Sequence, residues 1–378
     1  MSTVTKLIES FSTFEELDDP RTLNRLHPLL SLIAIAVCGT VAGCDSYADI
    51  ERFARERHRW FAQFLDLPHG IPSHDTFSRV FARLDTAQFF LCVQRWLSAV
   101  SGSLAGETVA IDGKTLRGSF DAAAGQSPLH LVNAWASERR LCLGQIAVDT
   151  KSNEITAVPE LLELLELRGA VVTLDAMHCQ RATTRAIVAR EADYVITLKK
   201  NQSTLWDDVS EHFIELAARE YPAGEVKRHI TVEQRHGRHE RREYYACPLP
   251  AKWRAKHRFS GLRTIGLVFR QRTVGDELQT DATYFISSLP AKIRTLAKHV
   301  RAHWGVENGL HWSLDVTFSE DRSRIRRGNG PELSGMLRRL VLSILRQDTT
   351  LKESLRGKRL IAGWNEHALA RIITNFHG

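Results

Sequence analysis

The chain has 378 residues and a mass of 42.8 kDa, long enough for two or three domains with a sizeable core. With 43% hydrophobic and 25% charged residues, its composition is that of a globular protein and excludes a chain dominated by low-complexity sequence. The net charge of +7 and a pI near 9.2 suggest a polyanionic partner such as nucleic acid, although many basic proteins bind none.

The cysteines predict a reducing compartment. They show no CxxC spacing and no pairing rhythm, which also argues against a structural zinc site. The six are Cys38, Cys44, Cys92, Cys142, Cys179 and Cys247. The start, MSTVTKLIESFSTFEELDD, is polar and acidic and lacks the basic segment of a signal peptide, so we expect a cytoplasmic protein.

One stretch is apolar enough to test as a membrane span, HPLLSLIAIAVCGTVAGC at 27–44. Its apolar run is about 16 residues, shorter than the ~20 that cross a bilayer, and it is rich in Ala, Gly, Cys and Thr. We expect a buried core helix here, with a membrane anchor at 29–44 as the alternative.

Residues 1–100 predict an all-helical N-terminal domain. The helical segments are TFEELDDP, the apolar stretch, SYADIERFARERHRWFAQFLDLP, and IPSHDTFSRVFARLD at 71–85 with an apolar stripe of Phe77, Val80, Phe81 and Leu84. The last two segments, joined by LPHGIPS, could form a helix-turn-helix that presents SHDTFSR to DNA. We favour a plain helical bundle that packs on the next domain, with SGSLAGE (101–107) as the boundary.

Residues 101–378 predict a second, mixed α/β domain. ETVAIDGKT predicts a strand, and LHLVNAWASERRLCLGQIAVDT predicts a hairpin with its turn at 137–140. Then follow a helix in NEITAVPELLELLELRG, a strand in AVVTLDA, a helix in QRATTRAIVAREA and a strand in DYVITLKKNQ. Three meandering strands followed by βαβ-type units describe an RNase-H-like mixed sheet.

Two of these strands carry an aspartate after an apolar run, Asp112 in VAIDGKTLRGS and Asp175 in VTLDAMHCQ. In an RNase-H-like sheet the first strand lies beside the fourth, so the two carboxylates would be neighbours. Adjacent carboxylates repel one another, which raises the pKa of at least one of them. A divalent cation removes that repulsion, and Mg²⁺ or Mn²⁺ is the usual partner of carboxylate oxygens.

Residues 203–287 predict an insertion made of a helix, NQSTLWDDVSEHFIELAARE, and hairpin-rich β structure. Between 225 and 258 ten Lys or Arg face four Glu, with Trp253 and the pair Tyr244–Tyr245 nearby. A basic β surface with aromatic residues suits contact with a phosphate backbone, and a merely solvated face is the alternative.

The segment KIRTLAKHVRAHWGVENGLHWSLDV predicts a helix that carries a glutamate on its apolar face. Its residues at three- and four-residue steps are Ile293, Leu296, Val300, Trp304, Glu307 and His311. A carboxylate among core residues is costly unless it has a function or a partner. The alternative to a functional Glu307 is a buried pair with Arg301, His303 or His311.

These stretches resemble the bacterial insertion-sequence transposases of the H-repeat-associated group, within the wider DDE class. The matching motifs run nearly end to end: DPR, GCDSYADIERFA, PSHDTFSRVF, AIDGKTLRGS, HLVNAWA, KSNEITAVPELL, TLDAMHCQ, DYVITLKKNQ, HGRHERRE and HWGVENGLHWSLDVTFSEDRSRIRRGNGPE. The resemblance implies an RNase-H-like catalytic domain with a β insertion before the third acid. It also implies that Asp112, Asp175 and Glu307 bind the metal ions.

The resemblance has one departure. Related DDE transposases often carry Tyr, Arg and Lys around the glutamate, where this chain has Val300, His303 and Leu314. Glu307 therefore keeps the rivals Asp315, Glu320 and Asp321.

Other residues are candidates for DNA contact. Phosphate contacts are predicted for Arg301, Arg324 and Arg326, and the basic insertion adds Arg238. Lys199, Asn201 and Gln202 could meet a DNA strand or only cap a loop, and Lys114 could contact phosphate or neutralise Asp112. His178 could transfer a proton or serve as a hydrogen-bonded spacer.

We therefore expect a Mg²⁺-dependent DNA transposase that cuts one strand at each end of its element and joins the 3′-hydroxyls to target DNA. It would act on the bacterial nucleoid, as at least a dimer in the complex with double-stranded DNA. The rival interpretations are a metal-dependent nuclease of the same fold and a DNA-binding copy whose catalytic site has decayed.

Overall fold

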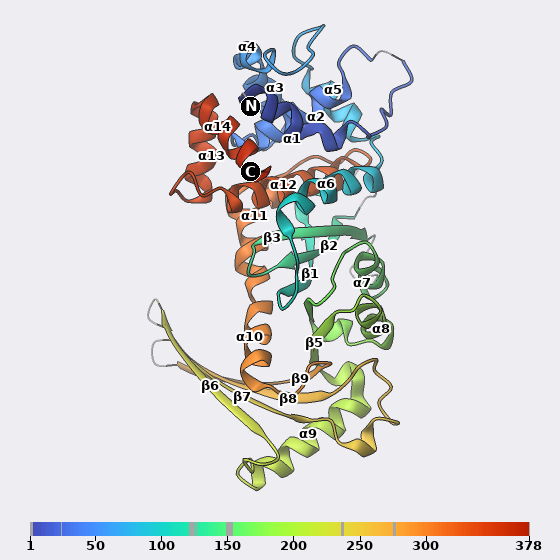
Figure 1. Ribbon diagram of the computed structural model, residues 1–378, viewed down its shortest axis with the longest axis vertical. Helices are drawn as coiled ribbons and strands as arrows, with labels where there is room; N and C mark the ends of the chain where they lie inside the picture. The colour runs from blue at the N-terminus through green and yellow to red at the C-terminus, as the bar shows by residue number, and fades with distance from the viewer. Residues whose placement is uncertain are drawn as a thin grey trace.

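The computed structural model describes residues 3–23, 25–120, 125, 127–148, 154–235, 238–274 and 277–377 (Figure 1). A nine-stranded sheet forms the body of the protein. The first and last helices of the chain lie together at one end, and the insertion lies at the other.

The N-terminal helices surround one apolar helix. They are α1 (Thr3–Phe11), α2 (Leu29–Val41), α3 (Tyr47–Glu56), α4 (His58–Phe61), α5 (His74–Phe81) and α6 (Thr86–Ser101). The expected helix in TFEELDDP lies earlier, at α1, and is followed by only a short 3₁₀ turn at Ser12–Phe14. The stripe predicted on α5 is confirmed, because Phe77, Val80, Phe81 and Leu84 are all buried.

The apolar stretch at 29–41 is a core helix, as predicted. Twelve of the thirteen residues of α2 are buried, so this helix is covered by protein on all sides. No helix among the described residues is long and apolar enough to be a candidate membrane span.

The sheet begins with the RNase-H-like order. Its strands run β3-β2-β1-β4-β5-β9-β8-β7-β6, and the first five are β1 (Thr108–Leu116), β2 (Leu129–Ala136), β3 (Leu141–Val148), β4 (Val171–Leu174) and β5 (Asp193–Leu198). β1, β2 and β3 pair antiparallel, while β1, β4 and β5 pair parallel. The predicted hairpin turn at 137–140 is confirmed, with Ala136 opposite Leu141.

Helices cover both faces of the sheet. Successive side chains of a strand point to opposite faces, and those of the central strand β4 are all buried, so both faces must be covered. Val171 and Val195 pack with Leu296 of α10 (Ile293–His303) on one face. On the other face lie α7 (Glu154–Glu163), which packs on β2 and β3, and α8 (Arg181–Ala189), which packs on β5. The predicted continuation of α7 to Gly169 is wrong: the helix ends at Glu163.

The insertion extends the same sheet rather than forming a separate one. After α9 (Ser203–Ala218) come β6 (Lys227–Arg235), β7 (Arg238–Pro248), β8 (Thr264–Val274) and β9 (Glu277–Ser287). β9 pairs antiparallel with β5, with Val195 opposite Ser287, so the long hairpins continue directly from the RNase-H-like strands. The sequence predicted the hairpins but not this pairing.

A nearly continuous helical run then returns along the sheet. It comprises α10, a π-helical turn η7 (Glu307–His311) and α11 (Trp312–Thr317), and is followed by α12 (Gly330–Gln347), α13 (Leu355–Trp364) and α14 (Glu366–Thr374). α12 packs against α2, α5 and α6 as well as β2 and β3, and α14 packs on α1 and α2. The end of the chain therefore completes the N-terminal helical layer, as the blue and red helices of Figure 1 show. The division into domains at residue 101 stays a proposal.

Candidate active site

Asp112 and Asp175 lie on neighbouring parallel strands. Ile111 of β1 stands opposite Leu174 of β4, and each aspartate is the next residue of its chain. Asp175 follows the end of β4, as expected, but Asp112 lies within β1, which continues to Leu116 paired only with β2. What ends at Asp112 is the pairing with β4, and this leaves the edge of the sheet open beside both carboxylates.

The Asp112 carboxyl resists ionisation. Its pKa is raised to about 6, mainly by burial and in smaller part by the nearby carboxylates of Asp175 and Glu307, while His303 acts in the opposite direction. Only 25% of its side chain is exposed, and its Oδ1 accepts a hydrogen bond of 2.9 Å from the backbone N–H of Gly113. A bound cation would offset both the burial of this carboxylate and its repulsion by the neighbouring ones.

Asp175 is held by a histidine from the α10 helix. His303 Nε2 lies 3.6 Å from Asp175 Oδ1, and its Nδ1 lies 3.0 Å from Thr173 Oγ1. The pKa of Asp175 is lowered, first by the interaction with His303 and then also by the Lys199 ammonium, against the effect of burial. His303 thus contacts one of the expected metal-binding acids.

Glu307 reaches the site from the π-helical turn η7, and its predicted burial is wrong. Its side chain is exposed, as is Trp304 one turn earlier, whereas His311 is buried. A π turn inserts one extra residue and shifts the face on which side chains point, so a helical wheel misplaces them here. The predicted alternative of a buried ion pair is not found among the described residues.

Among the residues that the structure describes, Asp112, Glu307 and His311 form a group that could hold a metal ion. One ligand atom from each lies within 4.8 Å of the other two. His311 Nδ1 is 3.6 Å from Asp112 Oδ2, and the other ring nitrogen is buried without a hydrogen-bond partner among the described residues. Burial lowers the pKa of His311 to about 3, so its imidazole is neutral and has a free lone pair at neutral pH. Two carboxylates and an imidazole fit a divalent cation of the Mg²⁺ or Mn²⁺ type.

A buried cluster lies directly beneath Asp112. Glu154 Oε1 lies 2.5 Å from His130 Nε2, and Oε2 lies 3.2 Å from His178 Nε2. These contacts lower the pKa of Glu154 to about 2, although burial raises it. A Cβ at Gly113 would lie 2.6 Å from both Glu154 Oε1 and His130 Nε2, which explains the glycine after Asp112. His178 is therefore a buried, hydrogen-bonded residue, and its other ring nitrogen has no partner among the described residues.

A cleft of about 600 Å³ opens at this edge of the sheet. Its lining includes Asp112, Asp175, His178, Lys199 and Asn201. Lys199 is exposed there, whereas Asn201 donates a 2.7 Å hydrogen bond to the carbonyl of Ala176. Gln202 Nε2 donates to Gln180 Oε1 at 3.3 Å. Asn201 and Gln202 therefore brace the loop, and Lys199 remains the candidate for a phosphate contact.

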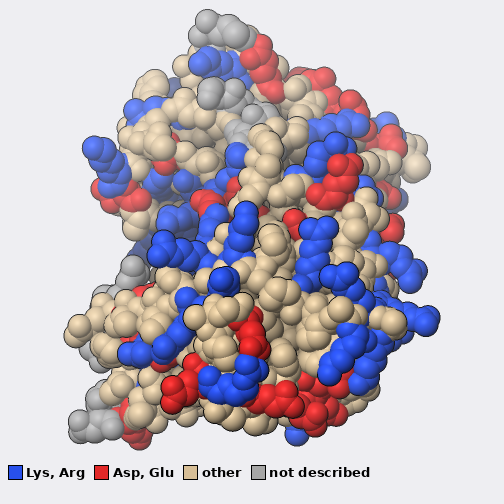
Figure 2. Space-filling view, turned by 60° about the horizontal axis from the view of Figure 1, so that its bottom comes forward, with Lys and Arg blue, Asp and Glu red and all other residues tan. Residues whose placement is uncertain are grey.

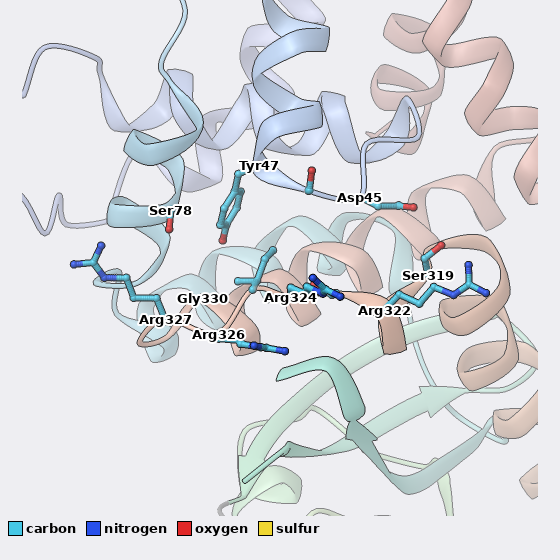
Figure 3. A pocket seen from close by; sticks show the side chains of 12 residues that line it. Asp45, Tyr47, Ser78, Ser319, Arg322, Arg324, Arg326, Arg327 and Gly330 are labelled. Carbon is cyan, nitrogen blue, oxygen red and sulfur yellow. The ribbon is translucent and has the colours of Figure 1, made fainter. Parts of the chain in front are cut away.

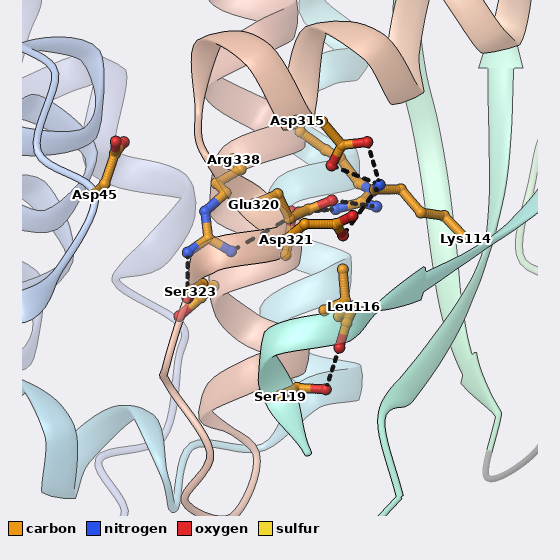
Figure 4. A network of polar contacts seen from close by, with 12 residues as sticks. Asp45, Lys114, Leu116, Ser119, Asp315, Glu320, Asp321, Ser323 and Arg338 are labelled. Carbon is orange, nitrogen blue, oxygen red and sulfur yellow. Dashed lines mark hydrogen bonds and ion pairs between the residues drawn. The ribbon is translucent and has the colours of Figure 1, made fainter.

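Lys114 does not neutralise Asp112. It is buried and its ammonium lies 2.7 and 2.8 Å from the two oxygens of Asp315, with Asp321 at 3.5 Å (Figure 4). The third rival acid, Glu320, is buried with its Oε1 2.8 Å from Arg339 Nη1. Asp315 and Asp321 thus pair with Lys114, and Glu320 pairs with an arginine of α12. None of these three rivals of Glu307 joins the group around Asp112.

The predicted arginine contacts have different surroundings. Arg301 donates from Nε and Nη2 to Glu233 at 3.1 Å each, which ties α10 to β6. Arg326 donates from Nε to the carbonyl of Gly118 at 3.2 Å. Arg324 is exposed. The side chain of Arg238, at the start of β7, lies outside the described residues.

The basic stretch of the insertion is a mixed surface. Figure 2 shows Lys and Arg interspersed with Asp and Glu over the face that carries it. Arg228 and Arg241 pair with Glu243, and Arg242 pairs with Glu233 and Glu240. The three aromatic residues expected at this surface are buried, namely Tyr244, Tyr245 and Trp253. A stacking platform for DNA bases is therefore not formed by them: the adjacent Tyr244 and Tyr245 of β7 point to opposite faces of the sheet and both faces are covered, while Trp253 packs in the same core cluster as Tyr245.

Two family patterns cover most of the chain. The pattern described as Transposase DDE domain matches residues 104–344, and the one described as DDE_Tnp_1-associated matches residues 11–97. This chain belongs to the DDE transposases. The "H repeat-associated putative transposase YhhI" of Escherichia coli K12 is 34% identical over 97% of this chain and 97% of its own length. The "Putative transposase YncI" of Escherichia coli O157:H7 is 35% identical over 92% of this chain and 90% of its own length.

One solved structure is similar to this chain at a low level. It is described as a piggyBac transposase synaptic complex with hairpin DNA, and it covers 99% of this chain and 78% of its own at 10% identity. The TM-score of 0.45 is too low to support any argument about details. The RNase-H-like strand order and the family assignment together confirm the fold class expected from the sequence.

His303 and His311 lie at the site although the sequence did not predict them there. Both flank Glu307 at a distance of four residues, in the pattern HxxxExxxH. That spacing places three ligand-type side chains on neighbouring turns of a helix and could have identified them.

Proposed function

We propose that this transposase cuts one strand at each end of its insertion element and joins the resulting 3′-hydroxyls to target DNA. The approach of Asp112, Asp175 and Glu307 at one open edge of the sheet carries the proposal. In the first reaction water attacks a phosphodiester and releases a 3′-hydroxyl. In the second that hydroxyl attacks a phosphodiester of the target, a new P–O bond forms and the bond to the target's own 3′-oxygen breaks, so one site serves both.

Each residue of the site would have a distinct role in this reaction. Asp112 and Glu307, with His311 beside them, would hold a divalent cation, and Asp175 would complete the site across the strand pair. His303 fixes the Asp175 carboxylate, and Lys199 would meet a phosphate oxygen in the cleft. When bound, Mg²⁺ or Mn²⁺ would lower the pKa of the attacking hydroxyl and neutralise charge on the leaving oxygen. Because two element ends must be handled together, we propose at least a dimer in the DNA complex.

The test is a joining assay with purified protein. A labelled duplex that carries the element ends would be incubated with a supercoiled target in Mg²⁺ or in EDTA. We expect metal-dependent joined products from the wild type. We expect Asp112→Ala, Asp175→Ala and Glu307→Gln to lower the rate at least about 100-fold while DNA binding is largely kept. The matched control is Glu160→Gln, an exposed acid on α7, which should leave joining unchanged.

Other outcomes would separate the rival functions. Cleavage without joining would favour a nuclease of the same fold. DNA binding without any reaction would indicate a catalytically decayed copy. Equal loss of DNA binding in the Asp112 and Asp175 variants would mean that the acids are structural, and the mechanism would be wrong.

A further inference from the structure

A second cleft, of about 520 Å³, lies between the N-terminal helices and the segment 319–330, away from the acidic edge of the sheet. Figure 3 shows Tyr47 and Ser78 of the N-terminal layer on one side and the arginines of the segment on the other. Its basic lining residues are Arg322, Arg324, Arg326 and Arg327. The sequence motif EDRSRIRRGN, which the proposed chemistry does not use, supplies them.

The charge of this cleft is largely uncompensated. Arg322, Arg324 and Arg327 are exposed, and none makes an ion pair with any residue that the structure describes. The acidic residue of the lining, Asp45, is occupied by Arg359, whose Nη2 lies 2.8 Å from its Oδ1. This differs from the insertion, where the arginines are matched by glutamates.

The segment that carries the arginines is fixed in place on both sides. Asn329 donates from its side chain to the carbonyl of Leu84 at 2.8 Å, and from its backbone to Ala82 at 3.1 Å. On the other side Arg326 is bonded to Gly118 and lies 5.0 Å from the Phe120 ring. Because the backbone is already ordered, little conformational entropy remains to be lost on binding an anion.

A further brace comes from beneath. Arg338 Nη2 donates to Ser323 Oγ at 2.8 Å, as Figure 4 shows, and Glu320 is buried beside it. The α12 helix also begins at Gly330 in the lining, so its N-terminal end adds positive potential to that of the arginines.

The cleft is within reach of DNA bound at the acidic site. The segment touches Gly118, which is six residues beyond Asp112 along β1 and the turn that follows. At about 3.3 Å per residue, Asp112 and Gly118, whose carbonyl Arg326 contacts, are at most ~20 Å apart, which is about six base pairs of duplex at 3.4 Å each.

We infer that this cleft binds the phosphodiester backbone of the DNA duplex about half a helical turn from the cleaved bond. The N-terminal helices and the arginine segment then form one DNA-binding surface. That the bound polyanion is DNA rests on the proposed function, and the position of the binding site rests on the unpaired arginines. Arg322, Arg324 and Arg327 each meet phosphate oxygens, with the Ser78 hydroxyl on the opposite wall.

The test is the salt dependence of DNA binding by the full chain in EDTA. The probe is a fluorescent 40-base-pair duplex, followed by anisotropy over a range of NaCl concentrations. We expect Arg324→Gln/Arg327→Gln to reduce the slope of log affinity against log salt by about 1 to 2, and Arg324→Lys/Arg327→Lys to retain most of it. The matched control, Arg356→Gln/Arg371→Gln, removes two exposed arginines from α13 and α14 and should leave the slope unchanged.

A second measurement locates the contact. Ethylation interference on an element-end duplex should show phosphates within about six base pairs of the cleaved bond whose ethylation weakens the wild type but not the Gln variant. Unchanged salt slope and interference in the Gln variant, or an equal loss in the control, would overturn the inference. So would binding of inorganic phosphate in the cleft without any effect of the Gln variant on DNA binding. If the wild type joins DNA normally but the Gln variant shows one of these contradicting results, only the inference about the cleft fails. If the wild type binds no duplex at all, the proposed function fails as well.

Discussion

At the scale of single residues, the site contains two histidines in addition to the three expected acids. His303 and His311 stand one turn on either side of Glu307, and each lies 3.6 Å from one of the two strand aspartates. Both imidazoles thus help to position the aspartate carboxylates. Both metals prefer oxygen ligands, but Mn²⁺ accepts an imidazole nitrogen more readily than Mg²⁺ does, so His311 bears on which of the two the site prefers.

We expect His311→Ala to weaken the apparent affinity for Mn²⁺ in the joining reaction by about 10-fold or more and to affect Mg²⁺ less. Metal titrations of the initial rate measure both. His367→Ala, an exposed histidine on α14, is the control and should change neither. An equal loss with both metals would mean that His311 only positions Asp112.

At the scale of elements, four segments meet at Glu154. It opens α7, and its histidine partners come from β2 and from the turn that follows Asp175, while Gly113 of β1 makes room for it. Thr115 Oγ1 lies 2.8 Å from His130 Nδ1 and extends the network along β1. This cluster therefore links the two strands that carry the aspartates.

The lowered pKa of Glu154 gives the stability of the fold a pH dependence. A carboxyl with a folded pKa near 2 and an ordinary value of 4.5 contributes stability above about pH 4.5 that is lost as the pH falls towards 2. We expect Glu154→Gln to lower the free energy of unfolding by about 1–3 kcal/mol at pH 7, and the difference from wild type to shrink at pH 3. Urea unfolding at both pH values measures it. A Glu154→Gln difference that is the same at pH 3 as at pH 7, or no larger than that of Glu160→Gln, would contradict this.

At the scale of the whole molecule, the two ends of the chain share one helical layer. α12 passes between the sheet and the N-terminal helices, and Arg359 of α13 joins three distant segments. Its guanidinium donates to the carbonyls of Thr40 and Thr317 and to Asp45, and lies 4.3 Å from the Phe318 ring. The arginine cleft is formed by this same arrangement.

We expect Arg359→Ala to lower the free energy of unfolding by about 3–5 kcal/mol, because it leaves buried carbonyls and Asp45 without their partner. Urea unfolding measures the loss, and amide hydrogen exchange should show it in α2. Arg356→Ala, on an exposed position of the same helix, should change stability by less than about 0.5 kcal/mol. Similar stability losses in the two variants would show that the hydrogen bonds of Arg359 do not stabilise the packing of α13 on the rest of the protein.

The sequence by itself determined the local elements and the two strand aspartates. Alternating apolar runs predicted β1 to β5 in the right order, and the hairpin turn at 137–140, because these patterns depend on residues close together in the chain. The apolar helix α2 was likewise evident. The family motifs added Glu307, which the periodicity alone placed among core residues.

The tertiary structure decided the rest, because it depends on contacts between residues far apart. Lys114 binds Asp315, 201 residues away, rather than Asp112 two residues away. Tyr244 is buried against Val171, Val195 and Leu296 because the insertion joins the main sheet through β9, and Tyr245 and Trp253 pack on Tyr221 and His212. The π turn exposes Glu307, and the C-terminal helices complete the N-terminal layer. Periodicity tells which residues share a face, but only the assembled fold determines what that face meets.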